Sequence, residues 1–197
     1  MSISIPFENA EIEDQEKIFS IKANQKSTLI AFLSQETVFI RDSSEYKCPI
    51  ITQYTRSDES QHEYGPNYWV QWIDKSTISW GTCSGAIFFS EFDELNQLQE
   101  PKTYIIDAAI PSTFSAYGYL AICQNNSVVQ FIKRTGEMVS TLNFNKGICR
   151  FRSVKFLYPS ILSGILGGSP FVAFLNKSSI EENTPFLFHF EEERNAI

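Results

Sequence analysis

The sequence has little of what most often carries catalysis or metal binding. Among its 197 residues are two histidines, His62 and His189, and four cysteines, with no CxxC pair and no HxxxH or similar metal-ligand spacing. The glycine-rich motifs that cradle phosphate groups, GxGxxG and GxxxxGKS/T, are also absent. Carboxylates are numerous, but they gather in tails and linkers rather than at strand ends, where a catalytic pair would lie. The sequence therefore predicts a non-enzymatic protein with no cofactor or metal.

Long apolar runs and an excess of positive charge are lacking as well. The most apolar stretch, 161–175, is broken by Gly167, Gly168 and Pro170 and is too short to span a bilayer. The N-terminus has neither the basic start nor the apolar segment of a signal peptide. A net charge of −7 disfavours general nucleic-acid binding. We therefore expect a cytosolic protein that does not bind nucleic acid.

The cysteines Cys48, Cys83, Cys123 and Cys149 are expected to be free thiols. Cys83 and Cys123 lie at strand–turn edges of two similar segments, where a small buried thiol is the ordinary structural role. A disulfide or a metal site is the alternative, and the spacing does not favour either.

What the sequence does contain is a repeat. Residues 78–89 read as an apolar strand, a tight turn at Ser84-Gly85 and a second apolar strand. Residues 120–131 and 162–173 have the same layout, and 30–41 is a copy with a shorter turn. The first residues of these copies, Ile30, Ile78, Leu120 and Leu162, are 48, 42 and 42 residues apart. A period in the forties, made of strands and tight turns, is typical of a β-propeller.

The repeat predicts an all-β fold, a β-propeller of WD-repeat type with about four four-stranded blades. We place the blades at 17–55, 68–102, 103–147 and 148–190 within a propeller region 17–190. Residues 1–16 are an acidic tail or a closing strand, and 191–197 are a charged end. Four blades are fewer than rings of this repeat size usually hold, so we expect an incomplete ring. An open ring leaves end faces bare, which predicts marginal stability and exposure of Phe144, Phe186 and Phe188.

Individual segments carry further expectations. Side chains alternate along a strand, so Val70 and Trp72 should share one face of their strand and Trp69 should lie on the other. Trp72 and Trp80 are expected to pack between neighbouring blades. The stretch 103–108 is expected to be the first strand of the third blade. The polar segment 56–67 is expected to be a surface loop, either a binding loop or a plain connector. Helix is expected at most as a turn or two within 90–99.

One part of the chain is basic. The segment 133–155 contains six lysine and arginine residues and only one acidic residue, Glu137. These cations are candidates for contact with a partner or a membrane: Lys133, Arg134, Lys146, Arg150, Arg152 and Lys155. An anionic membrane or an acidic partner would attract them, with about 1 kcal/mol for each cation near an anionic bilayer. Pairing with the glutamate-rich tails of the same chain is the alternative, and both interpretations stay open.

Three runs of residues resemble a known protein family. They are Pro-Ile-Ile-Thr-Gln-Tyr-Thr-Arg at 49–56, Tyr-Gly-Pro-Asn-Tyr-Trp-Val-Gln-Trp at 64–72 and Ser-Thr-Ile-Ser-Trp-Gly-Thr at 76–82. In order and spacing they resemble the N-terminal propeller of the Ric subunit of the Ric–Rgp complex, over roughly 28–92. Later blades are similar more loosely. Ser84 departs from the family pattern, which has Asn or Asp before the hairpin glycine.

The resemblance implies a cytosolic protein at the periphery of Golgi membranes. Together with an Rgp-type partner, such a protein promotes nucleotide exchange on a Rab GTPase in endosome-to-Golgi vesicle transport. No catalytic motif of the family maps onto these residues, and its long helical C-terminal part is missing. The chain alone is therefore not expected to exchange nucleotide. An unrelated WD-repeat adaptor and, less favoured, a propeller enzyme with a carboxylate-lined funnel are the alternatives.

Overall fold

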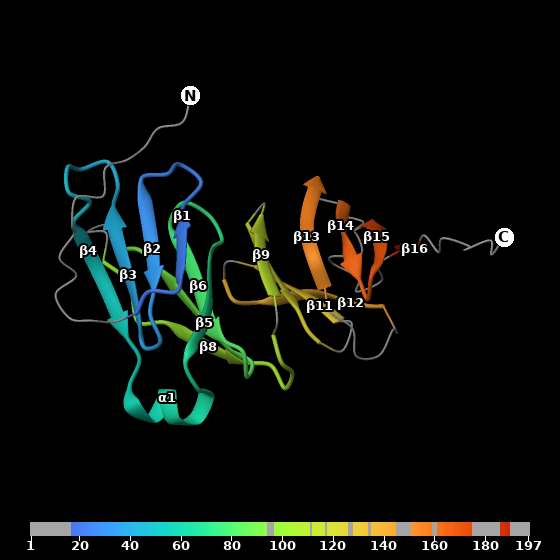
Figure 1. Ribbon diagram of the computed structural model, residues 1–197, viewed down its shortest axis with the longest axis horizontal. Coiled ribbons are helices and arrows are strands. Elements are labelled where there is room, and N and C mark those ends of the chain that lie inside the picture. Colours follow the sequence, from blue (N-terminus) through green and yellow to red (C-terminus); the bar gives the residue numbers. More distant parts are fainter. Residues whose placement is uncertain are drawn as a thin grey trace.

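Four antiparallel sheets of four strands follow one another along the chain (Figure 1). The computed structural model describes residues 17–93, 97–110, 112–116, 118–125, 128–133, 135–144, 151–158, 161–174 and 186–189. Blade one comprises β1 (Ser20–Ala23), β2 (Leu29–Leu33), β3 (Thr37–Asp42) and β4 (Ile50–Thr55). Helix α1 (Asp58–Tyr64) precedes blade two, which comprises β5 (Asn67–Trp72), β6 (Thr77–Thr82), β7 (Ala86–Glu91) and β8 (Lys102–Ile105). Blade three comprises β9 (Ser112–Ala116), β10 (Tyr119–Cys123), β11 (Val128–Lys133) and β12 (Met138–Asn143). Blade four comprises β13 (Phe151–Tyr158), β14 (Ile161–Leu166), β15 (Ser169–Phe174) and β16 (Phe186–His189).

The blades are joined through their first strands. In every sheet the strands lie side by side in chain order, and the first strands contact one another in sequence: β1 with β5, β5 with β9 and β9 with β13. The side-chain amide of Gln71 on β5 donates to the carbonyl oxygen of Thr113 on β9 at 2.9 Å. The first strands thus lie innermost, as in a propeller. Blades one and four lie at opposite ends of the array, so the predicted all-β fold and its open ring are confirmed (Figure 1).

The core is divided into three clusters, one at each junction between blades. Side chains alternate along a strand, so each blade has a leading face, toward the next blade in the chain, and a trailing face, toward the preceding one. At the first junction the leading face of blade one meets the trailing face of blade two. The buried residues there are Ala31, Leu33, Val38, Ile40, Val70, Trp72, Ile78, Trp80, Ala86 and Phe88. Trp69 lies instead in the second cluster, with Ile73, Ile87, Phe89, Ile110, Leu120, Ile122 and Ile132.

These clusters confirm that Val70 and Trp72 share one face of β5 and that Trp69 points the other way. They also confirm that Trp72 and Trp80 pack between blades. Trp72 connects three blades, because its indole N–H donates to the carbonyl oxygen of Lys22 in β1 at 2.9 Å, and its own carbonyl oxygen accepts a bond from the hydroxyl of Ser115 in β9.

The prediction that 103–108 opens blade three was wrong. Residues Lys102–Ile105 form β8, which pairs with β7 in blade two, and the first strand of blade three is Ser112–Ala116. The cause is the preceding segment, which turns straight back along β7. Phe92 bridges to Leu98, and the N–H of Gln99 donates to the carbonyl oxygen of Glu91 at 3.0 Å. The chain therefore emerges antiparallel to β7. A strand pattern alone does not state which sheet the strand joins.

Three further expectations need correction. The segment predicted as a loop contains α1, whereas the described part of 90–99 is strand and bridge rather than helix. Phe144 is not on a bare face, because it is buried between blades three and four, with its ring centroid 4.8 Å from that of Phe171. Cys83 is exposed, although Cys123 is buried and both are free. The side chains of the other two phenylalanines named with Phe144, at 186 and 188, lie outside the described part.

The turn between β6 and β7 depends on glycine. Gly85 has φ +111°, and a Cβ there would lie 1.9 Å from the carbonyl oxygen of Ile106. We therefore expect Gly85→Ala to lower the free energy of unfolding by about 2–4 kcal/mol, measured by urea denaturation. Gly168→Ala is the matched control: its φ is +94° but nothing lies within 4 Å, so its cost should be about 1 kcal/mol. Equal losses would contradict the packing of this turn against Ile106.

Candidate interaction surface

The segment between β4 and β5 leaves the array of blades and returns to the same place. At its start the N–H of Arg56 donates to the carbonyl oxygen of Glu36 at 3.0 Å, and at its end the N–H of Asn67 donates to that of Gln35 at 2.8 Å. Both ends are thus fixed to the turn between β2 and β3. Between them α1 projects from one end of blades one and two (Figure 1).

Arg56 holds this insertion from inside. Its side chain is only 2% exposed. The guanidinium donates to the carbonyl oxygens of Gly65 at 2.7 Å and Ser60 at 2.5 Å, and its Nε donates to the Ser60 hydroxyl at 3.1 Å. It lies 4.9 Å from the ring centroid of Phe88. These acceptors are neutral, and burial lowers the pKa of the guanidinium from its ordinary value. One buried cation therefore ties both ends of the helix to the wall of blade two.

Local sequence accounts for the helix. The hydroxyl of Ser57 caps its N-terminus by accepting from the N–H of Ser60 at 3.2 Å, and Gly65 ends it with φ +71°. The hydroxyl of Ser84, in the turn between β6 and β7, donates to the carbonyl oxygen of Tyr64. Ser84 is the residue that departs from the family pattern, and here it attaches the C-terminus of α1 to blade two. Serine at 57 and acids at 58 and 59 are start signals that sequence reasoning missed.

The outward side of the insertion is acidic. The exposed residues of α1 with ionisable side chains are Asp58, Glu59, His62 and Glu63. Loops on a rigid scaffold are the usual sites of binding, because the scaffold removes the entropic cost of ordering them. Because a buried arginine holds both of its ends, the insertion is a fixed surface element on the blades.

The predicted basic contact is brought together only in part. Arg152 and Lys155 lie exposed on β13, and Lys133 ends β11, with its ammonium 3.8 Å from the carboxylate of Glu137. The other three predicted contact residues, Arg134, Lys146 and Arg150, lie outside the described residues. A bulge in β13 between Arg152 and Lys155 keeps both on the face opposite the core residue Phe151. Contact of these cations with an acidic partner or an anionic membrane stays a prediction.

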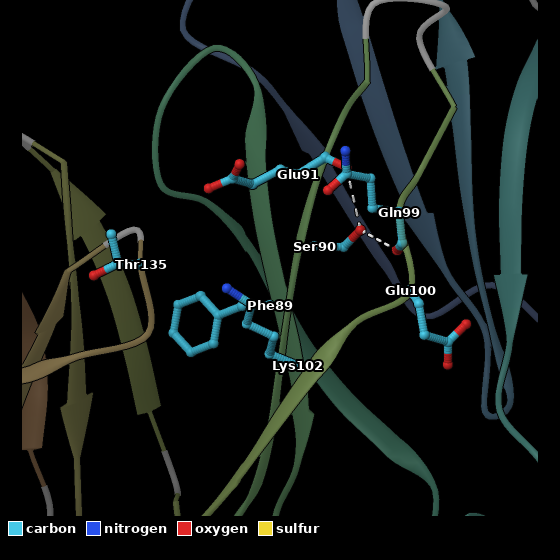
Figure 2. A pocket seen from close by; sticks show the side chains of 7 residues that line it. All are labelled: Phe89, Ser90, Glu91, Gln99, Glu100, Lys102 and Thr135. Atoms are coloured by element: carbon cyan, nitrogen blue, oxygen red, sulfur yellow. Dashed lines mark hydrogen bonds between the residues drawn. The ribbon is translucent and has the colours of Figure 1, made fainter.

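A small pocket lies where blade two meets the turn between β11 and β12 of blade three (Figure 2). Its volume is about 50 Å³, against roughly 300–1,000 Å³ for sites that hold drug-sized ligands. The hydroxyl of Ser90 donates to the carbonyl oxygen of Gln99 at 2.6 Å. The lining residues are Phe89, Ser90, Glu91, Gln99, Glu100, Lys102 and Thr135. The pocket has room for water but not for a cofactor.

Two further kinds of site are absent from the described residues. Within them, no group of three or more His, Cys, Asp or Glu side chains is placed to hold a metal ion. The helix in this part of the chain is too short and too polar to cross a membrane.

Several solved β-propellers resemble the chain in structure. Sqt1 of Saccharomyces cerevisiae superposes with a TM-score of 0.62 at 8% identity, over 87% of this chain and 50% of that one. Sqt1 from Chaetomium thermophilum gives 0.64 at 15% identity, over 80% and 45%. The β-propeller domain of Cps50 (Swd1) from Myceliophteria thermophila gives 0.61 at 10% identity, over 90% and 60%. No protein-family model matches the chain, and no curated protein matches it significantly.

These likenesses show the fold, a β-propeller of WD-repeat type. The chain spans about half the length of the solved chains that it matches. At such low identity the functions of those proteins are not carried over.

The role of Arg56 can be tested by keeping its charge and removing its fork of donors. Arg56→Lys is expected to lower the free energy of unfolding by about 2–4 kcal/mol, because lysine cannot replace bonds to Ser60 and Gly65 together. Urea denaturation measures the loss. Arg152→Lys is the control, since Arg152 is exposed and its change should stay within about 0.5 kcal/mol. If Arg56→Lys lowers the free energy of unfolding no more than the control does, the hydrogen bonds of Arg56 do not hold the insertion in place. We call these bonds to Ser60 and Gly65 the arginine clamp.

The cysteines should differ in reactivity. Burial raises the pKa of the Cys123 thiol, while Cys83 is exposed. In a Cys149→Ser background we expect a thiol reagent to modify Cys83 first and Cys123 only after unfolding, because the thiolate is the reacting form. Mass spectrometry at increasing times measures the order. Modification of Cys123 in the folded protein at the rate of Cys83 would contradict its burial.

Proposed function

We propose that the chain is a protein-interaction scaffold, the propeller part of an exchange-factor subunit for a Golgi Rab GTPase in endosome-to-Golgi transport. The observation that carries the scaffold function is the insertion bearing α1, a surface element fixed by a buried arginine to a rigid pair of blades. The partners would be an Rgp-type subunit and, through it, the Rab. The protein would act in the cytoplasm, peripheral to Golgi membranes.

The finer part of this proposal is supported by the resemblance over 28–92. The three resembling runs cover β4 with Arg56, the end of α1 with β5, and β6. In space these elements form one unit, the junction of blades one and two with its insertion. The runs border the protruding segment on both sides without including 57–63. The family pattern therefore marks the junction and the attachment points of the insertion, as a shared scaffold for a docking element would.

The exposed side of α1 suggests the chemistry of the partner surface. Glu59 and Glu63 lie one helical turn apart on a segment that the arginine clamp keeps in place. A partner with basic side chains at the contact would gain charge complementarity, which affects association and its salt dependence. No folding on binding is needed, because the helix is already formed.

The test is affinity capture of purified partners by the folded chain. We expect it to retain a purified Rgp-type subunit, and a GDP-loaded Rab when that subunit is present, without accelerating nucleotide release on its own. Glu59→Lys combined with Glu63→Lys should weaken capture by about tenfold or more. Glu45→Lys is the control: Glu45 is exposed in the turn between β3 and β4, at the other end of blade one from α1 (Figure 1).

The outcomes separate the alternatives. If the folded chain retains neither the Rgp-type subunit nor the Rab, the exchange-factor assignment fails, and an unrelated WD-repeat adaptor becomes the better interpretation. If partners bind but the two charge reversals have no effect, the assignment stands and the insertion is not the contact.

A further inference from the structure

The repeat allows equivalent positions in the four blades to be compared directly. Ile30, Ile78, Leu120 and Leu162 occupy the same place, near the start of the second strand and on the trailing face. In blades two, three and four this residue is 0% exposed, because the leading face of the preceding blade covers it. Ile30 in blade one is only half-buried. The described part of the chain provides no blade to cover it.

The trailing face of blade one is apolar well beyond this position. Ile21, Phe32 and Phe39 lie directly opposite one another across β1, β2 and β3, so they form one row on this face. Ile21 is 56% exposed, and the two phenylalanines are half-buried. Arg41 is the cation of the face, with its guanidinium 5.5 Å from the ring centroid of Phe32. Exposed apolar patches of this kind mark interaction sites.

The three observed junctions indicate what fits such a face. In each, the trailing face packs on an apolar leading face. That of blade one is small and aliphatic (Ala31, Leu33, Val38 and Ile40), and those of blades two and three also carry aromatic rings such as Phe89 and Phe131. The chain has one further leading face, that of blade four. It carries Ser163, Val172 and Ile165, of which Ile165 is 36% exposed. Both end faces thus carry exposed apolar side chains, and in the structure they lie at opposite ends of the array and do not meet (Figure 1).

Charge favours the same pairing. Arg152 pairs with Ile165 and Lys155 with Ser163, so both cations lie on the leading face of blade four, on its innermost strand. The opposite innermost strand, β1, is separated by three residues, among them Lys17, from the stretch 8–16, which contains five carboxylates and no lysine or arginine. A cationic strand would thus approach the strand that this acidic sequence precedes.

We propose that the trailing face of blade one docks onto the leading face of blade four in a second copy of this chain, so that two copies close one eight-bladed ring. Such a head-to-tail contact forms a ring when its rotation closes. Propellers typically hold four to eight blades, and two copies of four blades reach the upper end of that range. The chain covers 45% to 60% of solved propeller chains of the same fold, which is about half.

Three isoleucine-to-glutamate variants test the proposal by sedimentation velocity at micromolar concentration, with circular dichroism to check folding. The wild-type chain is expected at twice its 22.5 kDa. Ile21→Glu changes the trailing end face and Ile165→Glu the leading one, and each should sediment as a monomer. Ile105→Glu is the matched control: it is also 56% exposed, but it lies on β8 within blade two, so the dimer should persist.

Mixing the two defective variants gives the decisive result. Ile21→Glu keeps an intact leading face and Ile165→Glu keeps an intact trailing face, so the mixture should form a heterodimer through the one unaltered junction. A wild-type chain that stays monomeric would overturn the proposal and favour further blades from a longer polypeptide as the cover. A mixture that stays monomeric, or loss of the dimer in Ile105→Glu, would overturn it as well.

Discussion

Each blade of this protein depends on its neighbours to cover its apolar faces. A four-stranded sheet with apolar side chains on both faces buries nothing across those faces alone, and the three core clusters all lie between blades. Stability in such an array is a sum of blade and junction contributions. The open end of blade one follows from the same constraint, because it is a junction for which the described chain has only one half.

The junction of blades one and two also supports the proposed interaction surface, the α1 insertion. The indole of Trp72 bonds to β1 across it, and the guanidinium of Arg56 closes over Phe88 beside it. The arginine fixes the α1 insertion through carbonyl acceptors rather than a carboxylate. The strength of this attachment therefore depends on the positions of the guanidinium donors rather than on an ion pair. Scaffold and protruding surface are therefore one structure, and a change in the clamp should alter both.

The sequence predicted the architecture well because two periods are visible in it. Alternation along strands placed Val70 and Trp72 opposite Trp69, and the spacing of Ile30, Ile78, Leu120 and Leu162 marked the blades. It failed where the answer lay in contacts between distant segments. The sheet joined by 102–105 depends on the return of the chain at 92–98, and nothing in the pattern around Arg56 showed that it would be buried. The capping signals at the start of α1 were present but were outweighed by the polar composition of 56–67.

The central claim, that adjacent blades stabilise each other through facing side chains, is tested most directly by a double-mutant cycle across the first junction. Tyr54 of β4 and Trp80 of β6 have ring centroids 5.7 Å apart, and the indole N–H of Trp80 has no acceptor among the described residues, so their contact is packing alone. Tyr54→Leu, Trp80→Leu and the double variant should give a coupling energy of about 0.5–1.5 kcal/mol in urea denaturation. Losses that add to within about 0.3 kcal/mol would contradict the packing of these two blades.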